Sequence, residues 1–237
     1  PELLDWLAVE FVRHGWSIKQ LHRSILNSRT YRQSSAVSDS AQNRDPQNRL
    51  LSRMSLRRMD AESLRDTLLF VSGQLETTPG GPPDPVFVDR DGLVSVTPSP
   101  DGRWRRSIYL QYRRTEIPSM MATFDYPEMG PNCLSRSVST ISPQSLMLMN
   151  NQHVRELAAA FADRVVELAQ KRESERLEDH VQAVYEIALS RSPSSLESEI
   201  GVETLRELRA AWKDKPQAAI ESYCHTILNS AAFLYVD

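Results

Sequence analysis

The chain has 237 residues, a formal net charge of −3 and a charged fraction of 25%, a composition typical of globular proteins. At this length roughly 70 to 75% of the unfolded surface can be buried without a disulfide framework, and the apolar runs are too short to cross a membrane. The two cysteines, Cys133 and Cys224, match neither a metal motif nor a redox pair. A disulfide and two unreacted thiols both fit them, and we expect a buried thiol at Cys224.

The N-terminal residues predict a helical hairpin. Apolar residues recur at helical spacing over residues 1–14, and Gly15 is suited to end this helix in the left-handed conformation. A second helix is expected to begin after Ser17, which can form a capping box with Gln20. It should end at Asn27, because asparagine is common at helix C-termini.

The end of this second helix has a counterpart near the C-terminus. Residues 25–28 read Ile-Leu-Asn-Ser and are followed by Tyr31, and residues 227–230 repeat these four residues and are followed by Phe233. An internal duplication would explain the repeat. We favour the alternative, in which both are helix ends where asparagine stops the helix and the aromatic ring packs back onto the core.

The middle of the N-terminal half predicts a loop and then a well-marked helix. Residues 32–43 are rich in Ser, Gln and Asn and predict an exposed loop, after which Asp45 and Pro46 are expected to start a short helix. Asp60 is placed as the N-cap of a longer helix. The apolar residues of that helix recur at helical spacing: Leu64, Leu68, Val71 and Leu75.

A β insertion is predicted after this helix. Pro-Gly-Gly-Pro-Pro within residues 77–85 cannot continue a helix. Residues 86–88 and 93–96 indicate short strands around an Asp-Gly turn, and the alternation over 104–113 predicts a longer third strand. We therefore expect a small antiparallel sheet at about residues 84–114.

The rest of the chain predicts a connector and a series of helices. Residues 120–131 form a proline-punctuated connector, and Ser142 with Pro143 should start a helix. An Asn-Asn pair at 150–151 is expected to interrupt this helix, which then continues to about residue 171. Three further helices are indicated by apolar spacing over 177–188, by a capping box over 194–197 that leads to residue 212, and by apolar residues over 220–227.

The fold class expected is therefore mainly α, a multi-helix domain with a small antiparallel β insertion. We predict one domain over 1–237, helical over 1–78, loop and β insertion over 79–131, and helical again over 132–237. The chain starts at Pro1 with no methionine and no basic-then-apolar leader. We expect it to be a fragment of a longer protein.

A charged cluster around the Asp60 helix is the candidate site. Its members combine guanidinium and carboxylate groups: Arg57, Arg58, Asp60, Glu62, Arg65, Asp66 and Asp125. Carboxylates within one helical turn could serve acid–base chemistry or hold a metal. A helix cap, a first-turn glutamate and an arginine three residues later explain the same residues without any ligand, and we favour this structural interpretation.

Other signatures of chemistry are weak in this sequence. The five histidines form no close ligand pair, and neither a glycine-rich phosphate loop nor a Cys-x-x-Cys-His haem attachment motif occurs. Aromatic residues on the β insertion and connector could stack on a sugar or could be core: Trp104, Tyr109, Tyr112, Phe124 and Tyr126.

Charge is distributed unevenly along the chain. Residues 13–65 hold 11 basic and 4 acidic side chains, whereas residues 150–214 hold 9 basic and 13 acidic ones. A basic surface around Arg13, Arg23 and Arg29 could meet an acidic protein partner. The arginines lack the interleaved aromatic side chains of a nucleic-acid groove, so we do not expect nucleic acid as the partner.

Several sequence phrases together resemble the family called domain of unknown function 1553. They are Pro-Glu-Leu-Leu-Asp-Trp-Leu-Ala (1–8), Gly-Trp-Ser-Ile-Lys-Gln-Leu-His (15–22), Arg-Arg-Met-Asp-Ala-Glu (57–62), Arg-Asp (65–66), Ser-Gly (72–73), Arg-Ser-Ile-Tyr (106–109), Ser-Thr-Ile-Ser-Pro-Gln (139–144) and the closing residues 228–237. The resemblance covers essentially the whole chain. This family, found mostly in planctomycetes, forms the C-terminal part of large exported proteins, behind a cytochrome-c-like domain and another uncharacterised domain.

The resemblance implies a setting and no reaction, because the family has no established activity or catalytic residues. We expect a non-catalytic interaction or scaffold module without a cofactor of its own, with haem c confined to an upstream domain. Its partners would be the upstream domains of the same polypeptide, in the periplasm or cell envelope. The alternative is an envelope enzyme or polysaccharide-binding domain that acts in glycan breakdown.

Overall fold

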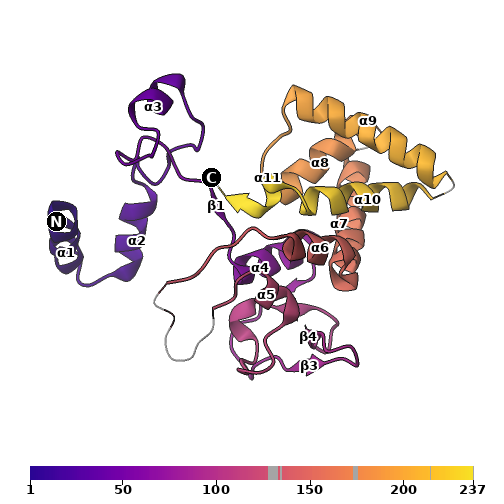
Figure 1. Ribbon diagram of the computed structural model, residues 1–237, viewed down its shortest axis with the longest axis horizontal. Helices are drawn as coiled ribbons and strands as arrows, with labels where there is room; N and C mark the ends of the chain where they lie inside the picture. The colour runs from indigo at the N-terminus through magenta and orange to yellow at the C-terminus, as the bar shows by residue number, and fades with distance from the viewer. Residues whose placement is uncertain (128–132, 134, 173–175, 214, 237) are drawn as a thin grey trace. The chain divides into compact units, whose positions relative to one another are not determined.

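The computed structural model describes residues 1–127, 133, 135–172, 176–213 and 215–236. The chain divides into two compact units, Pro1–Arg57 and Arg58–Val236, which are drawn together in Figure 1. Helices α1 to α11 dominate the described residues and the strands are two or three residues long, which confirms the mainly α fold. The single domain expected over the whole chain stays a prediction.

The N-terminal unit begins with the predicted helical hairpin. Helices α1 (Glu2–Arg13) and α2 (Ile18–Leu26) are joined by a tight turn in which Gly15 and Trp16 have φ angles of 64° and 61°. The Trp16 ring meets Phe11 edge to face at 5.3 Å between centroids. The Ser17 hydroxyl accepts a hydrogen bond of 3.2 Å from the Gln20 N–H, which confirms the predicted N-cap.

The next segment of this unit differs from the sequence prediction. A short helix, α3 (Asp39–Arg44), lies within the expected loop, and its first turn is capped by the Ser38 hydroxyl. The predicted helix start at Asp45 is wrong. The Asp45 carboxylate instead accepts from the N–H groups of Arg49 and Leu50 at 2.7 and 2.9 Å, because aspartate can close a turn as readily as it can cap a helix.

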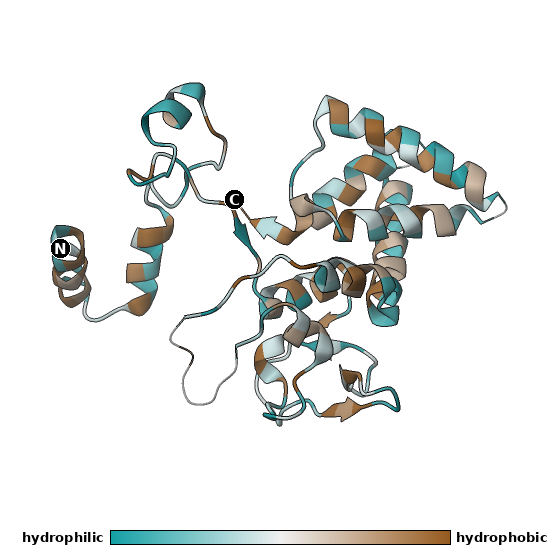
Figure 2. Ribbon diagram, viewed as in Figure 1, coloured by the Kyte–Doolittle hydropathy of each residue, from teal (hydrophilic) through white to brown (hydrophobic). Residues whose placement is uncertain are grey.

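The N-terminal unit has no apolar core of its own. Among residues 1–57, all of which the structure describes, Asp45 is the one buried residue. Apolar side chains of α1 and α2 remain uncovered, among them Leu3, Leu4 and Ile18, which are 71%, 72% and 62% exposed. Figure 2 shows hydrophobic residues along both helices.

The larger unit is built around α7 (Gln152–Lys171). This helix packs against α4 (Ala61–Ser72), α8 (Leu177–Leu189) and α10 (Pro216–Leu228), and α10 also packs against α9 (Ser195–Trp212) (Figure 1). Helix α4 confirms the predicted cap and the helix over residues 60–72, with Gly73 as its left-handed C-cap at φ 75°. The predicted extension of this helix to Leu75 is wrong, because the chain leaves the helix at this glycine and Leu75 begins a short strand. The shared core includes Leu64, Leu68, Phe124, Leu148, Phe161, Val165, Val184, Leu205, Tyr223 and Leu228.

The β insertion is smaller than predicted. Strands β3 (Val86–Val88) and β4 (Val94–Val96) form the expected antiparallel hairpin. The longer strand over 104–113 is wrong, because β5 (Trp104–Arg105) ends after two residues and the 3₁₀-helix η1 (Ser107–Tyr109) follows. Strand β5 pairs in parallel with β2 (Leu75–Glu76). The remaining two-stranded sheet joins β1 (Arg57–Arg58) and β6 (Tyr235–Val236).

The connector and the helix interruption are partly as predicted. A short helix, α5 (Ser119–Thr123), lies in the expected connector, whose residues 128–131 lie outside the described residues. Helix α6 (Ser142–Asn150) includes Ser142 rather than being capped by it. The interruption is confirmed at Asn151, whose side chain accepts from the Val154 N–H at 3.2 Å and so caps α7.

The repeated phrase adopts the same local structure at both places. Asn27 and Asn229 are C-caps, and the hydroxyls of Ser28 and Ser230 accept from the N–H of the aromatic residue three positions on. In the second copy that residue is Phe233 in α11 (Ala231–Leu234), which is buried in the core. Its N-terminal counterpart is exposed, so the predicted packing of the aromatic ring is confirmed at the C-terminal copy alone.

Candidate functional site

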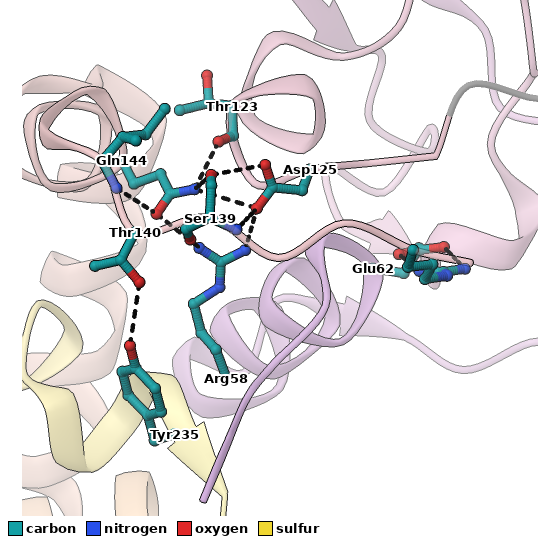
Figure 3. Close-up of polar contacts among 10 residues, drawn as sticks. Arg58, Glu62, Thr123, Asp125, Ser139, Thr140, Gln144 and Tyr235 are labelled. Carbon is teal, nitrogen blue, oxygen red and sulfur yellow. Dashed lines mark hydrogen bonds and ion pairs between the residues drawn. The ribbon is translucent and has the colours of Figure 1, made fainter. Parts of the chain in front are cut away.

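The charged residues around α4 fall into separate groups, and the most buried group is centred on Arg58. Its guanidinium donates to the Asp125 carboxylate at 2.5 Å, to the Gln144 side-chain oxygen at 2.6 Å and to the Ser139 carbonyl. Figure 3 shows these partners converging on Arg58 of β1 from the segment after α5, from the residues before α6 and from α6 itself. The Arg58 side chain is 4% exposed and also lies over the Phe124 ring, 5.6 Å from its centroid.

The Asp125 carboxylate is the acceptor that balances this buried cation. It also accepts from the N–H and the hydroxyl of Ser139, both at 2.8 Å. Burial acts to raise the pKa of Asp125, but the hydrogen bonds from Ser139 and Arg58 outweigh it and hold the pKa below its usual value. With φ at 62°, Asp125 adopts a left-handed conformation that aspartate tolerates better than most residues. Arg58 and Asp125 therefore form a charge-neutral clamp.

The second group lies at the exposed start of α4. Asp60 caps the helix by accepting from the Ser63 N–H at 2.7 Å, as predicted. Glu62 holds Arg136 through two hydrogen bonds of 2.7 Å, and Arg136 also lies 3.7 Å from Asp60. A first-turn carboxylate is favoured by the helix dipole, so these contacts stabilise the helix start.

The third group joins α4 to the turn after β5. Asp66 accepts from the N–H and the hydroxyl of Ser107, both at 2.7 Å. Arg65 donates to the Arg105 carbonyl at 2.9 Å and to the Ser107 hydroxyl at 3.3 Å. These bonds explain why the chain turns into η1 instead of continuing the strand.

The seven predicted site residues are thus not one cluster. Arg58 and Asp125 meet each other, Asp60 and Glu62 share Arg136, and Arg65 and Asp66 share Ser107. Arg57 is exposed at the end of the N-terminal unit. Most of these bonds join different segments of the chain. The carboxylates of Asp125, Glu62 and Asp66 are all engaged in them, so these residues do not present a free carboxylate pair to a substrate.

Several partners in these groups escaped the sequence analysis. These partners lie 41 to 86 positions along the chain from the residues of β1 and α4 that they contact, and they are Gln144, Ser139, Ser107 and Arg136. Another buried pair, Arg105 and Asp84 at 2.6 Å, lies wholly within the β insertion. The phrases that carry the family resemblance offered the one usable signal, because residues 57–62 and 139–144 contain both ends of the contacts from Arg58 to Ser139 and Gln144.

A cavity of about 380 Å³ adjoins the third group, and sequence reasoning did not find it. It is bounded by α4, the β3–β4 hairpin, α5 and the first turn of α7, with Arg65, Trp104 and His153 among its lining residues. The Trp104 and His153 rings lie 4.5 Å apart. Burial, followed by the nearby Arg65 charge, lowers the pKa of His153, so its imidazole is neutral near pH 7.

The predicted aromatic platform is dispersed. Phe124 is buried beneath Arg58, and Tyr109 lies under the Arg105 guanidinium at 4.9 Å. Tyr112 and Tyr126 lie near each other, with ring centroids 6.3 Å apart.

Neither a metal-binding cluster nor a membrane-spanning helix occurs among the described residues. No set of three or more His, Cys, Asp or Glu side chains there could hold a metal ion. No helix in those ranges is long and apolar enough to cross a bilayer. Cys133 and Cys224 are both free thiols, and Cys224 is buried as predicted, with its pKa raised by burial.

Comparison with known proteins gives a family and no activity. The family described as "Protein of unknown function (DUF1553)" matches residues 1–205. No curated protein matches the chain. No solved structure matches it either.

Proposed function

We propose that this chain, which belongs to the DUF1553 family, is a non-catalytic interaction module that binds the domains preceding it in a longer polypeptide. One observation carries this proposal. The N-terminal unit buries no apolar side chain, yet α1 and α2 display Leu3, Leu4 and Ile18. Exposed apolar side chains gathered on one pair of helices are typical of an interface.

The charge of the unit supports a particular kind of partner. Residues 1–57 hold nine basic and five acidic side chains, including Arg13, Arg23 and Arg29. An interface between domains of one chain typically buries about 600–1,500 Å² and is rather polar. An acidic surface with an apolar centre would complement α1 and α2 in both respects.

The charged groups of the larger unit support a scaffold role. Four side chains of these groups form hydrogen bonds to other segments of the chain: Arg58, Asp125, Arg65 and Asp66. Such bonds fix loops in place, which is a structural role. On this proposal the chain carries no cofactor, haem c belongs to an upstream domain, and the whole protein is exported to the periplasm or envelope. These last points rest on the family resemblance, and a Cys-x-x-Cys-His motif and a signal peptide in the upstream sequence would test them.

The proposal is tested by making the segment that precedes Pro1 separately and titrating it into residues 1–237. Association that weakens between low and high ionic strength is expected, because salt screens the charged part of the contact. No association in either buffer at high micromolar concentration would refute docking.

A second experiment tests the alternative function. A hydrolase panel and a glycan array on residues 1–237 should both give no signal, and a reproducible hit would favour an envelope enzyme or polysaccharide-binding domain instead.

A further inference from the structure

The cavity beside α4 contains a buried cation with an unused donor. Arg65 is 6% exposed and lines the cavity. Its Nη1 is occupied by the Arg105 carbonyl and the Ser107 hydroxyl. Its Nη2 is buried and has no hydrogen-bond partner. A buried guanidinium nitrogen without an acceptor is costly, so a ligand acceptor at this point would be favourable.

The charges near Arg65 leave room for one further anion. Asp66 approaches no closer than 3.7 Å and is itself engaged by Ser107. Burial lowers the pKa of Arg65 to about 10, against the raising effect of Asp66 and Asp84. The nearby carboxylates therefore do not fully offset the burial of this cation.

The remaining walls of the cavity define the ligand further. Gln152 and His153 belong to the first turn of the 20-residue helix α7, where backbone N–H groups lack intrahelical acceptors and favour an anion. Two acidic residues also line the cavity, but the Asp89 carboxylate is bonded to the N–H groups of Asp91 and Leu93, and Glu156 is largely exposed. Among the described residues, the cavity thus has one buried cation, Arg65, and two carboxylates at its walls. One buried cation suits a singly charged anion, and the two carboxylates disfavour a phosphate dianion.

The other lining residues are mostly apolar, including Val94, Met120, Leu157 and the ring of Trp104. Ligand pockets typically measure about 300–1,000 Å³ and combine such walls with a few polar groups. The volume of about 380 Å³ holds on the order of a dozen water-sized groups at about 30 Å³ each. We propose that this cavity binds a small monocarboxylate with an apolar or aromatic body, its carboxylate directed toward the Arg65 guanidinium and its body against Trp104.

The test compares three probes with the same body and different head groups on residues 1–237 at pH 7. These are 4-phenylbutyrate, 4-phenylbutanamide and 4-phenylbutylamine, titrated by calorimetry. The carboxylate should bind at least about 10-fold more tightly than the amide, the lower bound for a hydrogen bond to a charged group, and the amine should bind most weakly. Equal affinities, a preference for the amine, or no binding of the carboxylate at millimolar concentration would overturn the proposal.

Substitutions in the cavity test whether Arg65 recognises the carboxylate, apart from any effect on folding. Arg65→Gln should abolish the preference for carboxylate over amide. The control Arg164→Gln changes an arginine of α7 that donates to the Phe70 carbonyl of α4 and does not line the cavity, so it should preserve the preference. If Arg65→Gln does not fold, Val94→Phe provides the second test, because the larger side chain reduces the cavity and should weaken all three probes. Carboxylate binding unchanged in Val94→Phe, with the fold confirmed by circular dichroism, would place the ligand elsewhere and overturn the assignment.

Discussion

Asp125 accepts a 2.5 Å hydrogen bond from Arg58, a residue 67 positions earlier in the chain. The contact links the strand that leads into α4 with the segment after α5. It also places Asp125 against Ser139, ahead of α6. Arg58 and Asp125 thus connect three segments of the larger unit (Figure 3).

Arg58→Met should destabilise the protein by about 3 kcal/mol, because it leaves a largely buried carboxylate without its cation. The double variant Arg58→Met/Asp125→Asn should lose less than the sum of the two single changes. Urea unfolding measures all three. The control cycle uses the exposed pair Glu62 and Arg136, whose coupling should not exceed about 1 kcal/mol; equal couplings in the two cycles would contradict a structural clamp.

Asp60→Ala should cost about 0.5–2 kcal/mol through loss of the N-cap of α4. Asp60→Ser, which keeps a capping oxygen, should recover most of this loss. The free energy of unfolding is measured by chemical denaturation. An Asp60→Ala protein as stable as the wild type would show that the bond to the Ser63 N–H contributes little.

Gly201→Ala should destabilise the larger unit although alanine is the better helix former. A Cβ atom at this position of α9 would lie 2.4 Å from the Tyr223 hydroxyl oxygen and 2.9 Å from Val181 Cγ1. Overpacking of this kind costs about 1–3 kcal/mol. The melting temperature should fall, whereas substitution of alanine at the exposed Glu199 of the same helix should leave it nearly unchanged.

Glu197 should contribute stability that depends on pH. Hydrogen bonds from Arg191 lower the pKa of Glu197 from 4.5 to about 2. Burial acts to raise this pKa, and hydrogen bonds from Ser194 lower it further. A carboxyl group whose folded pKa is depressed stabilises the protein above its unfolded pKa, and this stability is lost as the pH falls toward the folded value. The loss caused by Glu197→Gln should therefore be largest above pH 5 and shrink between about pH 4.5 and 2. A loss that is constant with pH, or that matches the exposed control Glu199→Gln, would contradict this.

Local signals in the sequence predicted much of the fold. The predicted caps at Ser17, Asp60 and Ser194 depend on neighbouring residues alone, and each is present. Failures occurred where distant contacts decide the structure. Residues 104–113 alternate like a strand, but Ser107 is held by Asp66 from another element, and no local pattern reveals that bond.

The candidate site was harder to predict for the same reason. The sequence showed that charges cluster near α4, and it favoured a structural role for them. It could not show that Arg65 borders a cavity, because the other walls come from the β3–β4 hairpin and α7. The apolar spacing of α1 predicted an apolar helix face. It could not show that the rest of the N-terminal unit leaves this face exposed.

The most direct test of the interaction module is the affinity of the preceding segment for a surface variant. Leu4→Ser/Ile18→Ser removes exposed apolar side chains from α1 and α2, and burial of each such side chain is worth about 1.5–3 kcal/mol. The matched control, Leu196→Ser/Ile200→Ser, makes the same change on α9, where these residues are 63% and 57% exposed. We predict about 100-fold weaker binding for the first variant and wild-type binding for the control; equal affinities for both would contradict the role assigned to α1 and α2.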